Sequence, residues 1–243
     1  RGGYGLQRII DKVVLPQRPK DQWPMLVGFS DITALHSLLS LHGVASLHAN
    51  MCKDLSLLPD EDIALSAERE FFMADTIPSP LSFTSHLLPL TYHPSPHHAN
   101  VPYTIHHTSS SPLNRGGEVV GKLIGGNLSV LYGLQGTPYS LNKIIEQCEQ
   151  PPILFIEDIS ENHYHIDRML NSFRMSAVFD SIGGLVVGQF TDCADDPSMG
   201  CSLLESIRQV VDDYSFPILF DYPSGHIDSN YPLLLSADYL LSV

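Results

Sequence analysis

The stretch Trp23-Pro-Met-Leu-Val-Gly-Phe-Ser-Asp-Ile-Thr-Ala-Leu-His36 decides the fold of the first part of the chain. Its apolar first half, residues 23–28, predicts a short buried strand that ends at a glycine. In residues 31–42 the isoleucine and the leucines recur at helical spacing, and Gly43 follows as a stop signal. The pattern therefore places Ser30 at a turn between a strand and a helix.

The same alternation of strand and helix returns after residue 121. The predicted strands are residues 152–157, 184–188 and 217–220, the predicted helices are residues 161–173 and 203–211, and residues 233–243 predict a closing strand or hairpin. Strands that alternate with helices favour mostly parallel sheets. We therefore expect an α/β fold.

Between these two parts, residues 77–112 are dense in Pro, Ser and His and have no clear apolar period. We interpret them as an extended connection between two lobes. The expected division is residues 1–112, the first lobe with this connection, and residues 113–243, the second lobe. The histidines of the connection are His86, His93, His97, His98, His106 and His107. They raise a zinc hypothesis, but no HExxH motif or helical His pair accompanies them, so we expect incidental loop composition and no metal.

Composition narrows the class of protein. Asp and Glu number 27 against 13 Lys and Arg, for a formal net charge of -14. A surface this acidic repels phosphate backbones and anionic lipid, so we expect neither a nucleic-acid nor a membrane partner. The four cysteines are Cys52, Cys148, Cys193 and Cys201. They form no CxxC pair, so reduced thiols in a cytoplasmic protein are the simpler interpretation.

Gly28-Phe-Ser-Asp31 has the context of a nucleophile elbow: an apolar strand, a tight turn, a serine and then a helix. It lacks the second glycine of the G-x-S-x-G signature. The alternative is that Ser30 only caps the following helix. The glycine-rich turn Arg1-Gly-Gly-Tyr-Gly5 could bring N–H groups close to an oxyanion, or it could be a structural turn.

Two further residues could complete a catalytic site. His226 follows an apolar strand, where a cleft at the strand ends is expected, although the chain has 12 histidines. Glu157 ends a buried strand and could orient a histidine. It could equally form an ordinary ion pair with Arg168.

The order and wording of these segments resemble the LD-carboxypeptidases, the muramoyl-tetrapeptide carboxypeptidase family. The matching segments are Arg1-Gly-Gly-Tyr-Gly5, Gly28-Phe-Ser-Asp-Ile-Thr-Ala-Leu-His36, Leu47-His-Ala-Asn-Met51, Gly125-Gly-Asn-Leu128, Gly136-Thr-Pro138, Ile153-Leu-Phe-Ile-Glu-Asp158, His163-Tyr-His-Ile-Asp-Arg-Met169, Gly188-Gln-Phe190 and Pro223-Ser-Gly-His226. They run in family order and cover nearly the whole chain.

The resemblance implies two lobes with the active site between them: an N-terminal Rossmann-like lobe with a parallel sheet, and a C-terminal mixed α/β lobe. It implies a triad of Ser30 from the first lobe and Glu157 and His226 from the second. Family members hydrolyse the L,D bond before the terminal D-alanine of murein tetrapeptides, in peptidoglycan recycling in the cytoplasm. They need no cofactor or metal and are commonly homodimers. We therefore expect a serine-type LD-carboxypeptidase with these properties.

The expected reaction needs further groups. The N–H of Asp31 and a glycine N–H from Gly2 or Gly3 are the candidate oxyanion donors. An exopeptidase also needs a cation or an N–H cluster that captures the free carboxylate of the substrate. The candidate substrate-binding residues are Arg168, Arg1 and Asn127.

Three departures from the family pattern stand out. The family carries strands and helices ahead of the Arg-Gly-Gly motif, so we expect either a fragment with a truncated first lobe or a first lobe that something else completes. The connection is longer than usual, and Tyr231-Pro-Leu-Leu234 replaces the expected Leu-Pro-Leu-Gly. Two alternatives stay open. One is the microcin-immunity branch of the family, which cleaves acyl-adenylates; the other is a catalytically inactive, truncated peptide-binding relative.

Overall fold

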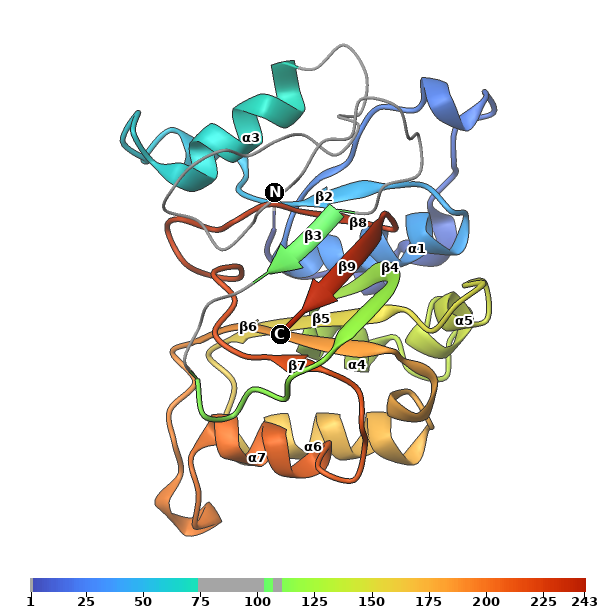
Figure 1. Ribbon diagram of the computed structural model, residues 1–243. Helices are drawn as coiled ribbons and strands as arrows, with labels where there is room; N and C mark the ends of the chain where they lie inside the picture. Colours follow the sequence, from blue (N-terminus) through green and yellow to red (C-terminus); the bar gives the residue numbers. More distant parts are fainter. Residues whose placement is uncertain (1, 74–102, 107–110) are drawn as a thin grey trace.

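A computed structural model describes residues 2–73, 103–106 and 111–243 and shows an α/β protein with two sheets (Figure 1). The smaller sheet has the order β1 (Val27–Gly28), β2 (Ser46–His48) and β8 (Leu233–Leu235). β1 and β2 are parallel, whereas β8 runs antiparallel to β2. A strand from the end of the chain thus completes the sheet that carries the serine turn.

The larger sheet has six strands. Their order is β3 (Tyr103–His106), β9 (Asp238–Ser242), β4 (Glu118–Asn127), β5 (Ile153–Ile159), β6 (Gly184–Thr191) and β7 (Ile218–Leu219). β4 to β7 are parallel, as the alternating pattern predicts, and β9 is antiparallel to β4. The α/β class and the mostly parallel central strands are therefore confirmed.

The described helices cover these sheets. They are α1 (Thr33–Leu41), α2 (Cys52–Leu55), α3 (Ile63–Met73), α4 (Leu128–Gly133), α5 (Leu141–Ile145), α6 (His163–Met175) and α7 (Leu203–Val210). α6 and α7 lie side by side below β5 to β7 in Figure 1. None of the helices in the described ranges is long and apolar enough to cross a membrane.

Both faces of β5 are buried, which explains why its first four residues, 153–156, are all apolar. Leu154 and Ile156 point to one face and join a core with residues of α4, α5, α6 and α7. Ile153 and Phe155 point to the other face and pack with residues of β8 and β9. One face of β5 is therefore covered by helices, and its other face packs against β8 of the small sheet and β9 of its own sheet.

Two predicted elements differ from the structure. The strand predicted over residues 23–28 is reduced to β1, because only its last two residues pair with β2. The predicted closing hairpin is instead two strands in different sheets: β8 pairs with β2, and β9 pairs with β4 and β3. Hydrophobic pattern alone cannot distinguish these pairings, because both strands are buried.

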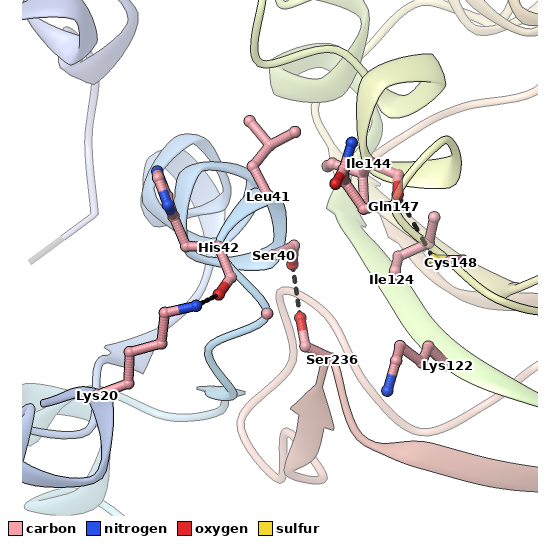
Figure 2. A pocket seen from close by; sticks show the side chains of 11 residues that line it. Lys20, Ser40, Leu41, His42, Lys122, Ile124, Ile144, Gln147, Cys148 and Ser236 are labelled. Carbon is pink, nitrogen blue, oxygen red and sulfur yellow. Dashed lines mark hydrogen bonds between the residues drawn. The ribbon is translucent and has the colours of Figure 1, made fainter.

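A cavity of about 320 Å³ lies where the end of α1 meets β4 and α5 (Figure 2). Ser40 Oγ and Ser236 Oγ lie 2.8 Å apart across it. Lys20 Nζ donates to the His42 carbonyl, and Lys122 pairs with a carboxylate of β9. Both ammonium groups therefore already have oxygen partners, and we assign no ligand to this space between α1 and the large sheet.

Candidate active site

Ser30 lies in the sharp turn between β1 and α1. Its φ of 65° places it in the left-handed region. For a residue other than glycine this conformation costs on the order of 1–3 kcal/mol and is typical of functional turns. Gly28 precedes it with a φ of 150°, where a Cβ would lie 3.2 Å from Ile32 Cγ1. The local structure is therefore the strained strand-turn-helix geometry that exposes a serine hydroxyl.

The alternative role of Ser30 as a helix cap is not observed. The short helix Ser30–Ile32 begins after Phe29, and no side chain caps it. α1 begins after Ile32, again without a side-chain cap. The hydroxyl of Ser30 is thus not used to satisfy the start of either helix.

Glu157 and His226 form a hydrogen-bonded pair. Glu157 stands near the end of β5, and His226 stands in the loop that follows β7. His226 Nδ1 lies 2.7 Å from Glu157 Oε2, with the Glu157 side chain fully buried and that of His226 14% exposed. Phe29 packs edge-on against the His226 ring, with the ring centroids 4.9 Å apart. A carboxylate on Nδ1 fixes the ring and leaves Nε2 for proton exchange.

Each member of this pair shifts the pKa of the other. Burial by itself would raise the pKa of Glu157, but the hydrogen bond from His226 and the nearby His226 and His48 rings outweigh it, so the pKa is lowered. Burial would lower the pKa of His226, but the hydrogen bond and charge of Glu157 outweigh it, and this pKa is raised. The pair therefore favours an ionised carboxylate beside a histidine of increased basicity.

Ser30 and His226 line one cavity of about 1040 Å³. The other lining residues are Gly2, Gly3, Val27, Phe29, Asn50, Met51, Cys52, Lys53, Asp54, Leu55 and Phe72. Within the described ranges, no hydrogen bond joins Ser30 to His226. Catalytic hydrogen bonds are often long before substrate binds, so the shared cavity is the relevant relationship.

The candidate oxyanion residues lie beside the serine. Asp31 Oδ2 accepts a hydrogen bond of 3.0 Å from the Leu6 N–H, which fastens the glycine-rich segment to the turn. Gly2 is so close to Ser30 that a Cβ on Gly2 would lie 3.3 Å from Ser30 Cβ. The Gly2 N–H points at Met51 Sδ, 3.0 Å away. The structure thus brings Asp31, Gly2 and Ser30 together, as predicted, while the role of each N–H stays a prediction.

Asn127 lies at the end of β4, where its neighbour in the register is Glu157. Its carboxamide is buried, accepts from the Val130 N–H at 3.1 Å and donates to Asp158 Oδ1 at 2.9 Å. Asp158 also accepts from the Ser129 N–H, and burial raises its pKa to about 6. The Asn127 side chain therefore caps α4 and does not line the large cavity.

Of the two arginines proposed for the substrate carboxylate, Arg168 does not line the large cavity. The Arg168 guanidinium on α6 lies over the Tyr164 ring, 5.5 Å from its centroid. Its alternative partner, Glu157, is bonded to His226 instead. Arg1 falls outside the described residues.

The zinc hypothesis cannot be followed in the structure, since His86, His93, His97, His98 and His107 lie outside the described residues, as does the side chain of His106. In the described ranges, no group of three or more His, Cys, Asp or Glu could hold a metal ion.

Three residues that sequence reasoning did not assign also lie at the site. Lys53 is the only lysine or arginine among the described lining residues of the large cavity. His48 in β2 lies 3.8 Å from Glu157 Oε1. Asp158, next to Glu157 in β5, accepts a hydrogen bond from Asn127. His48 and Asp158 carried a signal, because they stand in the family-like segments Leu47-His-Ala-Asn-Met51 and Ile153-Leu-Phe-Ile-Glu-Asp158, whereas Lys53 carried none.

The comparisons with known proteins agree with this geometry. A family model described as the LD-carboxypeptidase C-terminal domain matches residues 120–241, and one described as the LD-carboxypeptidase N-terminal domain matches residues 1–49. A Bacillus subtilis relative named "Probable murein peptide carboxypeptidase" is 30% identical over 97% of this chain and 65% of its own length. The Escherichia coli microcin C7 self-immunity protein MccF is 28% identical over 49% of this chain and 32% of its own length.

The crystal structure of the muramoyltetrapeptide carboxypeptidase from Oxalobacter formigenes has the same fold, with a TM-score of 0.70 and 24% identity. The match covers all of this chain and 73% of the Oxalobacter formigenes chain. The fold and the family models together define an α/β protein of the LD-carboxypeptidase type, with a serine, a histidine and a glutamate at the candidate site. The chain belongs to the LD-carboxypeptidase family. It spans 62–65% of the length of the first curated relatives that it matches.

Proposed function

We propose that this protein is a serine carboxypeptidase that hydrolyses the L,D bond before the terminal D-alanine of murein tetrapeptides. The observation that carries the proposal is the cavity shared by Ser30, in its strained turn, and His226, bonded to Glu157 at 2.7 Å. The names of the murein peptide and muramoyltetrapeptide carboxypeptidases that it resembles support the choice of substrate.

In the proposed mechanism, His226 Nε2 takes the proton of Ser30 as the hydroxyl attacks the amide carbon. Glu157 keeps the tautomer with Nδ1–H and stabilises the imidazolium. The N–H of Asp31 and a glycine N–H from Gly2 or Gly3 receive the oxyanion. His226 then protonates the departing D-alanine amine, and water hydrolyses the acyl-enzyme by the same route.

Lys53 is the cation that we propose for the free carboxylate of the terminal D-alanine. It stands in α2 and lines the same cavity as Ser30. An ammonium group pairs with a carboxylate as a point charge and needs no fixed angle. Arg168 lies elsewhere in the structure, over Tyr164, so Lys53 is the better candidate of the two.

Hydrolysis of an acyl-adenylate is the second candidate function, because a self-immunity protein is among the relatives. Such a substrate needs an aromatic surface for the nucleobase. Trp23 does not line the large cavity; its indole N–H bonds to the Arg18 carbonyl. Phe29 and Phe72 do line it. A third candidate is a relative that binds peptide without turnover.

We further propose that the protein is a cytoplasmic homodimer, following the murein-recycling role, and that its lobes divide at about residue 112. β3 and β8 each pair in the sheet dominated by the other part of the chain. The two lobes would therefore share strands rather than separate cleanly.

One experiment separates the candidates. The protein is incubated in parallel with L-alanyl-γ-D-glutamyl-diaminopimelyl-D-alanine, with the same peptide ending in L-alanine, and with an aspartyl-adenylate analogue that can be hydrolysed. We expect D-alanine release from the first alone. Cleavage of only the adenylate would establish the second function. Binding of the tetrapeptide by calorimetry without any release would establish the peptide-binding alternative.

A further inference from the structure

The second oxygen of Glu157 has a neighbour that the triad does not use. Glu157 Oε2 bonds to His226, whereas Oε1 is buried without a hydrogen-bond partner among the described residues. His48 Nε2 is likewise buried and unpartnered there, and it lies 3.8 Å from Oε1. A buried ring nitrogen that can donate and a buried carboxylate oxygen that can accept thus face each other, on the side of Glu157 away from His226.

The His48 ring is held firmly in this orientation. It comes from β2, its side chain is fully buried, and it packs edge-on against Phe155, with the ring centroids 5.0 Å apart. On the opposite side of the ring, Nδ1 lies 3.4 Å from Ser224 Oγ. The small sheet therefore aims His48 at a carboxylate that belongs to the large sheet.

The neighbouring hydrogen bonds indicate which atoms donate. Asn230 Oδ1 accepts from the Gly225 N–H at 2.9 Å and from Ser224 Oγ at 3.0 Å. A neutral imidazole has one N–H, and a carboxylate oxygen only accepts, so the tautomer that fits carries its proton on Nε2, toward Glu157 Oε1. In that tautomer Nδ1 is an acceptor, and the Ser224 hydroxyl lies between two acceptors, Nδ1 and Asn230 Oδ1.

We propose, on the basis of the function proposed above, that His48 is a positioning residue of the triad, which holds the Oε1 side of Glu157 so that Oε2 stays on His226. Glu157 then has two imidazole partners: His48 from the small sheet, and His226 from the loop that follows β7 of the large sheet. Contact between the two sheets at this point becomes a condition for a correctly oriented general base.

The charges around Glu157 give this role a distinctive signature. Glu157 is faced by His48 from β2, by His226 from the loop after β7, and by Asp158, its neighbour in β5. Burial would raise the pKa of Glu157, and the two histidines together lower it. Loss of His48 therefore raises the pKa of Glu157. A carboxylate that is no longer held on His226 also raises the pKa of that ring less, so the acidic limb of kcat/KM moves to lower pH. A purely structural defect lowers the amount of folded enzyme and leaves this limb unmoved.

The test compares His48→Leu with His48→Gln, whose amide N–H can still reach Oε1. The control is His163→Leu, because His163 is also a buried histidine but bonds to Ser206 on α7, at 2.7 Å. Full pH profiles of tetrapeptide cleavage are measured together with the ¹³C carboxylate titration of Glu157. His48→Asn, whose amide is too short to reach Oε1, replaces His48→Leu where the latter does not fold.

We expect His48→Leu to lower kcat on the order of tenfold to a hundredfold with little change in KM. Its Glu157 titration should move to higher pH, and its acidic limb should move to lower pH. His48→Gln should recover most of both, and His163→Leu should change neither. An unmoved Glu157 titration in His48→Leu, or an equal shift in His163→Leu, would overturn the positioning role. Because the titration needs no turnover, it still tests His48 if the parent protein releases no D-alanine, an outcome that counts against the proposed function alone.

Discussion

His226 Nδ1 lies 2.7 Å from Glu157 Oε2, although the two residues are 69 positions apart in the chain. The carboxylate stands near the end of β5, and the histidine stands in the loop after β7. In a parallel sheet these positions meet at one edge, which is where clefts form. The same edge faces Ser30 across the cavity.

Replacing the acid should disable the pair without unfolding the protein. In Glu157→Gln the amide can present an N–H to His226 and favour the wrong tautomer, so kcat should fall on the order of 10³–10⁴-fold. Initial rates of D-alanine release provide the measurement. Glu146→Gln is the control, because Glu146 forms an exposed pair with Lys143. A comparable loss in both variants would contradict the role of Glu157.

The pH dependence of kcat/KM follows from the raised pKa of His226. The ring must be neutral to accept the Ser30 proton, so activity should fall as pH drops through this pKa. The midpoint of the acidic limb should lie above the usual histidine value of 6.5. In Glu157→Gln the effect of burial remains without its counterweight, so residual activity should have a midpoint below 6.5. A parent midpoint below 6.5 would contradict this assignment.

Close approach of β4 and β5 should make Gly125 intolerant of a side chain. A Cβ there would lie 1.9 Å from the Phe155 carbonyl oxygen, and its φ is 130°. Gly125→Ala should therefore cost about 3–5 kcal/mol in the free energy of unfolding. Gly43 also has a positive φ but has no atom within 4 Å of such a Cβ. Gly43→Ala should cost only about 1–2 kcal/mol. Equal losses in denaturant titrations would show that the contact is not limiting.

Removal of the cavity cation should weaken recognition of the substrate carboxylate. Lys53→Met should raise KM for the tetrapeptide roughly tenfold with a smaller effect on kcat, because the ion pair forms in both ground and transition states. A tetrapeptide with an amidated C-terminus should be insensitive to the substitution. Lys20→Met is the matched control, since Lys20 lines the cavity at the end of α1 and not the one that contains Ser30. Equal sensitivity of the two peptides would exclude Lys53 as the carboxylate ligand.

The fold was largely predictable because its signals are local. The glycine and the apolar run before Ser30, and the helical spacing after it, specify the turn and α1. β5 and β6 are buried on both faces and therefore read as continuous apolar runs. β8 and β9 show the limit: both are apolar, but which sheet each one joins depends on contacts far away in the sequence.

Candidate site residues could be named from the sequence where a residue type carries chemistry, and could not be named where only the position in the fold matters. Ser30 follows β1, Glu157 lies near the end of β5 and His226 lies in the loop after β7, so the strand topology brings the three residues to one region. Lys53 has no sequence signal, since an exposed lysine in a short helix is ordinary. Arg168 was a reasonable carboxylate ligand by charge, but the helical spacing of α6 brings it onto Tyr164 four residues earlier.

The most direct test of the central claim is the release of D-alanine from the murein tetrapeptide by the parent protein and by Ser30→Ala, with folding of both checked by circular dichroism. The account predicts steady release by the parent and a loss on the order of 10⁴-fold or more in Ser30→Ala. Release that continues at a comparable rate in folded Ser30→Ala would contradict the assignment of Ser30 as the nucleophile.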